Sequence, residues 1–380
     1  MVTYPYEWKE LSFKKTINSV PFNIYLKQPR ISGEFIVVQQ GDSPIAGYAN
    51  GSPYRDYKKV VLFGDHTLSL YKPSTPFFVA TDGIRILSCK ENIDRDYLYY
   101  FLQKYKPESE GYKRHFSILL RMDVFLPELS EQQAIASVLS DFDEHIDNLS
   151  ELIEKKKAIR DGALEDLLSG RTRLDGFDGE WKTVSFNQVI KPKARIGWQG
   201  LKKDEYLRSG YSYLIGGTDF HNGTVNLDNI SYVSKERYDM DSNIHVESNN
   251  VLVTKDGTIG KVALVPKLDR PATLNSGVFV FRTTSSLLPI FLYRVLLSSV
   301  FREFINTLSA GSTIKHLYQK DLSNFEFIIP QDTKEQEAIA EVLTAMDDEI
   351  ESLETEKEKM MQIKEGAMDD LLTGRVRLKV

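Results

Sequence analysis

The chain has 380 residues, of which 41% are apolar, 11% aromatic and 27% charged, and Cys89 is the single cysteine. This length argues for at least two domains, and the composition excludes a largely disordered chain. One cysteine excludes an intrachain disulfide and a zinc site built on several thiolates. No run of 18 apolar residues occurs and no export signal opens the chain, so we expect a cytoplasmic protein with no membrane partner.

The first stretch in chain order, residues 1–126, has a mixed composition typical of a globular domain. It opens with Glu7-Trp8-Lys9 and Ser12-Phe13, and the same pieces return 173 residues later, at residues 180–182 and 185–186. The second occurrence opens another mixed stretch, residues 175–329. The chain is therefore interpreted as two tandem copies of one unit.

A long polar segment follows each mixed stretch, at residues 127–174 and 330–380. When residues 131–174 are aligned with residues 335–378, 22 of the 44 positions are identical without a gap. Such a match indicates that the two segments share one structure and one role.

Both polar segments carry the signals of a helix. Each begins after a proline, Pro127 or Pro330, and each ends at a glycine, Gly170 or Gly374. Ser130 precedes Gln133 by three residues and Thr333 precedes Gln336 by three, which predicts a capping box at each start. The length between these signals corresponds to roughly 58 Å of helix.

Apolar residues repeat along each segment at heptad spacing, which predicts a narrow seam that needs a partner helix along its whole length. The partner is expected to be the other copy, running antiparallel because the chain crosses to the second domain and returns, with the chain ends close together. The predicted seam residues are Leu139, Phe142, Ile146, Leu149 and Ile153 in the first segment and Leu343, Met346, Ile350, Leu353 and Met360 in the second.

A glycine interrupts each predicted helix at the equivalent position, Gly162 and Gly366. Glycine destabilises a helix interior by about 1 kcal/mol relative to alanine. Two explanations stay open, a close helix crossing that only glycine permits and a bend.

The formal net charge of −6 is unevenly distributed. The aligned helical segments carry −12 together, which leaves +6 on the remaining 292 residues. A modest positive charge with many tyrosines and phenylalanines is compatible with a nucleic-acid partner, although scattered solvated lysines explain it equally simply.

Motifs of catalysis and metal binding are missing from the sequence. The six histidines show no metal-ligand spacing. The segment Gly257-Thr258-Ile259-Gly260-Lys261 lacks the first glycine and the hydroxyl residue of a phosphate loop. We therefore expect no catalytic residue, no metal and no bound cofactor in this chain.

The repeated segments resemble a known family. Glu131-Gln132-Gln133-Ala134-Ile135-Ala136 through Leu167-Leu168-Ser169-Gly170-Arg171, with the copy at residues 335–375, is similar to the helical repeats of DNA-specificity subunits of type I restriction-modification systems. The resemblance covers essentially the whole chain. It implies an α+β fold in which two pseudo-two-fold related target-recognition domains, residues 1–126 and 175–329, are separated by two long antiparallel coiled-coil helices.

The resemblance also implies a function. Each target-recognition domain would read one half of a bipartite, asymmetric site in double-stranded DNA, and the helices would set the distance between the halves and dock two modification (methyltransferase) subunits. Restriction/translocase subunits would complete the complex. S-adenosylmethionine, ATP and magnesium would then be bound by these partners, which methylate adenine and cleave DNA.

Short pieces of the two mixed stretches supply the predicted DNA contacts, because lysines suit phosphates and hydroxyls or histidines suit phosphates and base edges. The second domain carries most of them, and their counterparts in the first domain follow only a rough similarity. These residues are Lys255, Thr258, Lys261, Ser312, Thr313, Lys315 and His316 in the second domain and His66, Thr67, Lys113, Arg114 and His115 in the first.

Two other functions remain open from the sequence. One is a scaffold whose coiled helices are the working part and whose domains bind proteins instead of DNA. The other is the recognition subunit of a related system in which restriction and methylation reside in one fused partner chain.

Overall fold

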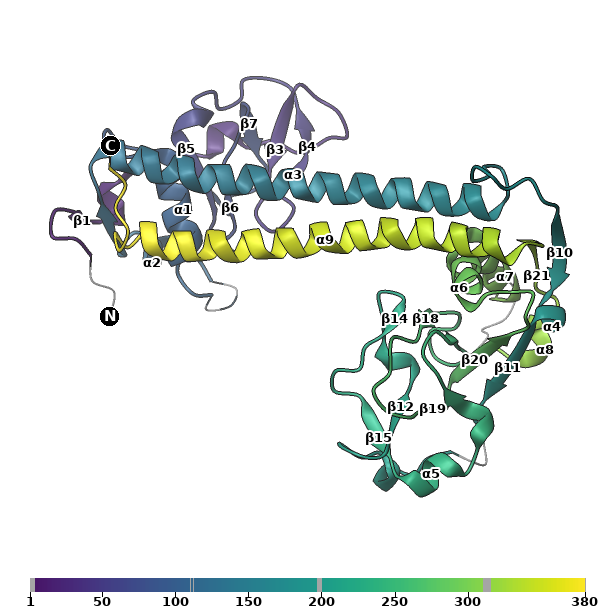
Figure 1. Ribbon diagram of the computed structural model, residues 1–380. Coiled ribbons are helices and arrows are strands. Elements are labelled where there is room, and N and C mark those ends of the chain that lie inside the picture. Colours follow the sequence, from purple (N-terminus) through teal and green to yellow (C-terminus); the bar gives the residue numbers. More distant parts are fainter. Residues whose placement is uncertain (1–3, 110, 112, 197–199, 310–315, 380) are drawn as a thin grey trace. The chain divides into compact units, whose positions relative to one another are not determined.

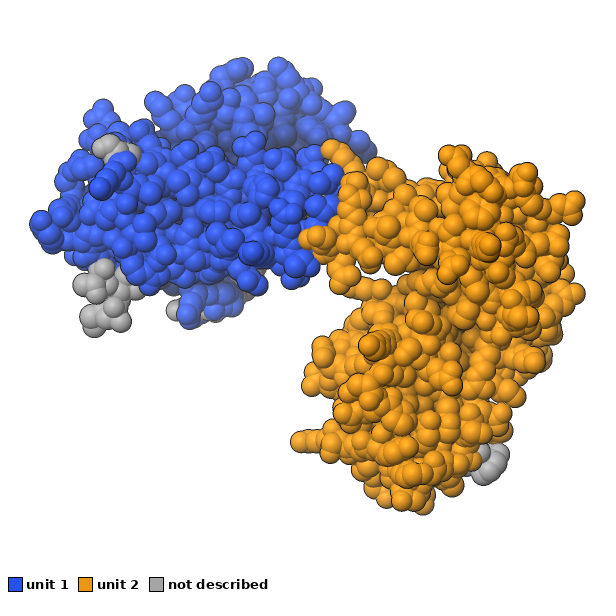
Figure 2. Space-filling model, viewed as in Figure 1, with its two compact units in different colours: residues 1–152, 353–380 blue, residues 153–352 orange. Residues whose placement is uncertain are grey.

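A computed structural model describes residues 4–109, 111, 113–196, 200–309 and 316–379. The fold is α+β, as predicted. The chain forms two compact units, residues 1–152 with 353–380 and residues 153–352, which Figure 2 shows in two colours. Each unit contains one mixed stretch and about half of each long helix. The boundaries drawn from the sequence instead separate the helical segments, residues 127–174 and 330–380, from the domains. Those boundaries stay a prediction.

The two polar segments are helices, α3 (Leu129–Leu168) and α9 (Thr333–Leu371), as Figure 1 shows. The predicted capping boxes are wrong. Ser130 lies inside the first turn of α3, and Thr333 is already the first helical residue of α9. Asp332 takes the capping role instead, because its carboxylate accepts a hydrogen bond from the Lys334 amide at 2.9 Å.

A buried glutamine fixes the start of each long helix. Gln336 donates to the carbonyls of Ser286 and Pro330, both at 2.9 Å, and accepts from the Leu288 amide at 2.9 Å. Gln132 makes the equivalent three bonds in the first unit, with Asn92, Pro127 and Asp94. The repeated sequence therefore produces the same anchoring of helix to domain twice.

Within each unit the halves of α3 and α9 pack side by side and run antiparallel. In the first unit the Lys364 ammonium pairs with Asp143, and Arg377, beyond the end of α9, pairs with Glu131 near the start of α3. In the second unit Lys156 pairs with Glu349 at 2.7 Å. The antiparallel pairing is thus confirmed, and so is the nearness of the two described chain ends, because Arg377 also reaches Glu7 at 3.4 Å.

All ten predicted seam residues are buried or half-buried. Leu139 and the equivalent Leu343 are completely buried. Gly162 and Gly366 lie elsewhere on the helices, where an added Cβ would meet nothing within 4 Å. The close-crossing explanation for these glycines is therefore wrong.

An arginine that follows each long helix clamps the start of the other long helix. Arg377 binds both carboxylate oxygens of Glu131 at 2.7 Å, and Arg173 binds those of Glu335 at 2.6 and 2.9 Å. Each guanidinium also lies over a tryptophan ring, Trp8 or Trp181. Both glutamates are buried, and an unpaired buried carboxylate would strongly destabilise the fold. Each bidentate arginine therefore supplies the counter-charge and the hydrogen bonds that its glutamate needs.

The domain of the first unit contains three sheets, with strand orders β1-β9, β2-β8-β5-β6 and β4-β3-β7. The central strand β5 is apolar and completely buried, since sheet neighbours and helix α1 cover it. The strands are β1 Lys9–Ser12, β2 Ile17–Val20, β3 Phe35–Val38, β4 Ile45–Ala49, β5 Val60–Gly64, β6 Leu70–Tyr71, β7 Phe77–Val79, β8 Ile84–Cys89 and β9 Asp123–Leu126, and the short helices are α1 Arg95–Tyr105 and α2 Phe116–Leu119.

The domain of the second unit repeats this plan with additions. Its sheets have the orders β10-β21, β11-β20-β17-β18-β14-β13 and β15-β12-β19-β16. The strands are β10 Trp181–Ser185, β11 Ile190–Ala194, β12 Ser212–Ile215, β13 Phe220–His221, β14 Thr224–Val225, β15 Ser231–Val233, β16 His245–Val246, β17 Val251–Thr254, β18 Val262–Leu264, β19 Ala272–Leu274, β20 Val278–Thr283 and β21 Glu326–Pro330. The helices are α4 Phe186–Val189, α5 Lys235–Asp239, α6 Pro289–Leu297, α7 Ser299–Ser309 and α8 Gln319–Leu322.

Equivalent strands keep equivalent partners in the two domains. β3 pairs with β7 in parallel and β4 antiparallel, and β12 pairs with β19 in parallel and β15 antiparallel. β5 and β17 each lie between two antiparallel neighbours. Among the described residues, no helix is long and apolar enough to span a membrane.

Candidate nucleic-acid interface

The tight loop of residues 255–261, between β17 and β18, carries three of the predicted DNA contacts. The buried Thr254 holds it closed, since its carbonyl accepts from the Gly260 amide and its hydroxyl from the Lys261 amide, both at 2.9 Å. Gly257 and Gly260 have φ values of 70° and 80°, which few other residues tolerate. The loop therefore presents Thr258 and Lys261 to solvent in a fixed geometry.

His316 joins this loop from a distant part of the sequence. The Leu317 amide donates to the Lys255 carbonyl at 2.7 Å, and the His316 ring nitrogen Nδ1 lies 2.6 Å from the Asp256 carboxylate. Lys255 is half-buried, with its ammonium 5.8 Å from the centre of the Phe279 ring. The structure thus brings Lys255, Thr258, Lys261 and His316 together, while Ser312, Thr313 and Lys315 lie outside the described residues.

The first domain places its predicted contacts at the equivalent strand end. The turn after β5 carries the exposed Thr67 and the half-buried His66, whose ring nitrogen Nδ1 lies 3.2 Å from the Lys113 carbonyl. Lys113 and Arg114 are exposed beside this turn, and Arg114 pairs with Asp82 at 3.0 Å. Four of the five residues predicted for this domain therefore share one surface.

His115 is the exception, and its assignment as a DNA contact is wrong. Its side chain is completely buried, and its ring nitrogen Nδ1 donates to the Asp65 carbonyl at 3.0 Å. Asp65 is also buried, and its carboxylate accepts from the Arg85 guanidinium and from the Phe116 amide. His115 therefore helps to tie the turn to the domain interior and has no face for a ligand.

Sequence reasoning missed residues 39–44, the loop that follows β3. Gln40 of this loop accepts a hydrogen bond from the His66 amide at 3.2 Å, and the Gly41 amide donates to the Ser69 hydroxyl at 2.9 Å. A sequence signal was available only indirectly, because a polar Gln-Gln-Gly-Asp run directly follows a buried apolar strand.

The chemistry of both loop clusters suits recognition. Ammonium, guanidinium, hydroxyl and amide groups donate or accept hydrogen bonds at the surface, as binding to phosphates and base edges requires. Among the described residues, no group of three or more histidine, cysteine, aspartate or glutamate side chains could hold a metal ion.

Comparison with known protein families decides which class of protein carries this arrangement. The family model described as type I restriction modification DNA specificity domain matches residues 6–157 and 179–362, most of the chain. The chain belongs to the type I restriction-modification specificity family. The two matches begin near Trp8 and Trp181 and each includes one domain and part of a long helix, in agreement with the internal repeat.

Several members of the specificity family have detectable similarity to this chain. The specificity subunit of the type I restriction enzyme MjaVIII from Methanocaldococcus jannaschii is 27% identical over 270 residues, which are 67% of this chain and 62% of that protein. The putative MjaX specificity subunit from the same organism is 26% identical, over 82% of this chain and 75% of that protein. The chain thus spans less than two thirds of the length of the MjaVIII subunit.

Solved structures of the specificity family show the same fold. The S subunit of a type I restriction-modification system from M. genitalium matches with a TM-score of 0.62 at 15% identity, over 96% of both chains. A chain from a structural study of assembly and conformational transition in the type I R-M system matches with a TM-score of 0.58 at 14% identity, over 98% of this chain and all of that one. At these identities the likeness concerns the fold.

Proposed function

We propose that this chain is the non-catalytic, sequence-specific DNA-binding subunit of a type I restriction-modification complex. Each unit would read one half of a bipartite, asymmetric site in double-stranded DNA through its loop cluster, around Lys261 in the second unit and around Thr67 in the first. The two domains differ in sequence, so the two half-sites are expected to differ as well.

The observation that carries this proposal is the pair of loop clusters at equivalent strand ends. Each cluster joins the turn after a buried central strand, β5 or β17, to a segment from just before the last strand of the domain, at residues 113–114 or 316. Two related readers in one chain would suit a DNA duplex, whose backbone has an approximate dyad, as paired recognition elements do in dimeric DNA-binding proteins.

The long helices supply the remaining parts of the proposed function. They would set the distance between the half-sites and offer acidic surfaces to two modification subunits. Those subunits would bind S-adenosylmethionine and methylate adenine, and restriction/translocase subunits would bind ATP and magnesium. This chain would act in the cytoplasm, where the DNA is, and would hold no cofactor of its own.

The experiment that tests this proposal is a domain exchange read out by adenine methylation. The full chain is expressed with its modification subunit, and methylated adenines are mapped by sequencing genomic DNA. Residues 1–126 are then replaced by the corresponding domain of a relative. We expect a bipartite methylated site in the first case, and after the exchange a new sequence in one half-site while the other stays unchanged.

Two outcomes would contradict the proposal. An unchanged methylated site after the exchange would mean that the first domain reads no bases and would favour a scaffold. Methyltransferase or nuclease activity of the purified chain alone, with S-adenosylmethionine or magnesium, would show that the chain is an enzyme.

A further inference from the structure

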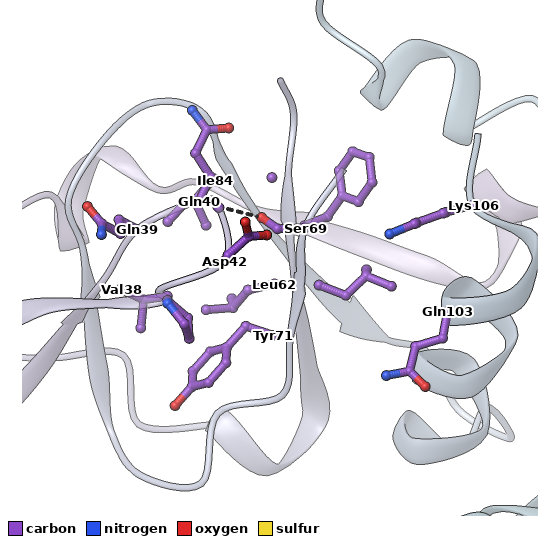
Figure 3. Close-up of a pocket in the computed structure, with 15 residues that line it drawn as sticks. Val38, Gln39, Gln40, Asp42, Leu62, Ser69, Tyr71, Ile84, Gln103 and Lys106 are labelled. Atoms are coloured by element: carbon purple, nitrogen blue, oxygen red, sulfur yellow. Dashed lines mark hydrogen bonds between the residues drawn. The ribbon is translucent and has the colours of Figure 1, made fainter. Parts of the chain in front are cut away.

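A cavity of about 450 Å³ opens in the first unit beside the predicted DNA contacts (Figure 3). Gly64 and Ser69, the ends of the turn that carries His66 and Thr67, form part of its wall. Gln103 of α1 and Lys106, the residue that follows α1, also line it. The cavity is therefore continuous with the proposed reading surface of this domain.

The loop of residues 39–44 forms another wall of the cavity and is locked to the reading turn. Besides the bonds of Gln40 to the His66 amide and of Gly41 to Ser69, the loop is closed on itself, since Gln39 donates from its backbone to the Pro44 carbonyl at 2.8 Å. A loop held at both ends and in the middle presents its side chains in one geometry, as recognition of a specific base requires.

Two glycines border the half-buried Gln40 side chain closely. A Cβ added at Gly83 would come within 2.4 Å of the Gln40 side-chain nitrogen, and one added at Gly64 within 2.9 Å of its Cβ. The absence of a side chain at Gly83 and Gly64 thus leaves the space that the Gln40 side chain occupies. Gln40 is a positioning residue for the turn of His66 and Thr67.

Asp42 lies on the same loop and is available for a ligand. Its side chain is exposed on the cavity wall, and its carboxylate makes no hydrogen bond or ion pair with any described residue. Figure 3 shows it among the side chains that surround the cavity.

The second domain has an aspartate at the equivalent place, but that carboxylate is already used. Asp219 comes four residues after β12, as Asp42 comes four residues after β3. The Asp219 carboxylate accepts from the Gly216 amide at 2.7 Å and is half-buried, and this burial raises the pKa of Asp219. The two domains therefore differ in whether this acid closes its own loop or remains free.

A free carboxylate on a DNA-reading surface restricts the groups that it can meet. It repels phosphates and, when ionised, only accepts hydrogen bonds. The donors that base pairs offer in the major groove are exocyclic amino groups, N4 of cytosine and N6 of adenine. Each base pair presents one such amino group, on the strand that carries its cytosine or adenine, so an aspartate held at a fixed place favours the pair whose amino group lies there.

We propose that Asp42 determines one base pair of the half-site read by the first domain, by accepting a hydrogen bond from the exocyclic amino group of a cytosine or an adenine. Gln40 holds the loop and the neighbouring turn in the geometry that this contact needs. The inference rests on the proposed function and assigns a specificity-determining residue within it.

The experiment compares Asp42→Asn with Glu91→Gln in the full chain expressed with its modification subunit. Glu91 is also an exposed acid of the first domain. The cavity is lined by Ile84 at the start of β8, whereas Glu91 follows the end of this strand, so its variant is a matched control for loss of one negative charge. We expect Asp42→Asn to reduce the preference at one position of one half-site about tenfold. The pair that relaxes, C·G or A·T, identifies which amino group Asp42 binds, and Glu91→Gln leaves the site unchanged.

A second pair of variants tests the positioning role. Gln40→Ala removes the acceptor for the His66 amide and is expected to weaken methylation through the first half-site as a whole, whereas Gln40→Glu keeps an acceptor oxygen and should restore it. Reading of the second half-site stays unchanged in both variants.

The proposal is overturned if Asp42→Asn methylates the wild-type site with both half-sites unchanged, or if it weakens both half-sites equally. Equal methylation by Gln40→Ala and Gln40→Glu would overturn the positioning role. Failure of the proposed function itself is distinguishable, because the wild-type chain would then direct no bipartite methylation at all.

Discussion

Each unit surrounds one aspartate of a long helix with donors from the other helix and from the domain, but the donors differ between the units. Asp143 and Asp347 occupy equivalent positions on the two long helices, and each faces a cation from the other helix, Lys364 or Arg160. In the first unit the third member is the Tyr100 hydroxyl, which donates to Asp143 at 2.7 Å. In the second unit it is the Arg294 guanidinium, which pairs with Asp347 and donates to Thr344 at 2.8 Å.

The two carboxylates differ in the group that each domain contributes, a phenol in the first unit and a guanidinium in the second. Burial raises the pKa of Tyr100, and its bond to Asp143 raises it further, so the phenol stays a neutral donor. Burial by itself would lower the pKa of Arg160, but the carboxylates of Asp347 and Asp161 more than offset this effect and raise it. Around Asp347 the second unit adds a buried cation, Arg294, which is 3% exposed, to Arg160. In the first unit a neutral phenol takes the place of Arg294.

Removing the central carboxylate should expose this difference most strongly. Asp347→Ala leaves two guanidinium groups without their partner, one of them buried, and we expect it to destabilise the protein by about 3–5 kcal/mol. Asp143→Ala leaves a lysine that can reach solvent and a phenol, and we expect a loss of about 1–2 kcal/mol. Urea unfolding of the two variants and the wild type measures both values.

Equal losses of stability would show that the burial of Arg294 has no energetic consequence. The double variant Asp347→Ala, Arg294→Met is the control, because replacing the buried cation by an unbranched apolar side chain should recover much of the loss.

The two arginine clamps should differ less. Arg377→Ala leaves Glu131 buried with no replacement donor from Trp8, whose indole nitrogen has no hydrogen-bond partner among the described residues. Arg173→Ala leaves Glu335 with the Trp181 indole as donor at 3.3 Å. We expect losses of about 2–3 and 1–2 kcal/mol respectively, measured by urea unfolding. A larger loss for Arg173→Ala would contradict this order.

The smallest effects concern the two proposed reading surfaces. Lys261→Ala and Lys113→Ala each remove one exposed cation, and we expect each to lower DNA affinity of the complex a few-fold, equally for specific and unrelated sequences. Each should also reduce the slope of log affinity against log salt by about one unit. Fluorescence anisotropy at several salt concentrations, with Lys182→Ala as the control outside both loop clusters, measures these changes. Unchanged slopes would exclude both lysines as phosphate contacts.

Much of the fold could be predicted because its strongest signals are local and repeated. A proline, a heptad seam and a terminal glycine specify a helix from neighbouring residues alone, and 22 identities in 44 positions specify that the structure occurs twice. The helix starts were misplaced. Asp332 caps α9 one residue before the predicted Thr333, and the buried glutamines that anchor both helices act through contacts with distant segments. In the site, residues from one loop, such as Thr258 and Lys261, were found together, but the role of His115 was not foreseen.

The sequence by itself thus determined the duplication, the two long helices and the family, because each follows from residue order or spacing. Only the tertiary structure decided which side chains are exposed on the proposed reading surfaces. Burial of His115 and the freedom of Asp42 depend on segments that are distant in the chain and become neighbours only on folding. Exposure is a property of the packed molecule, and identical residue types at similar positions, such as Asp42 and Asp219, acquire different roles when their surroundings differ.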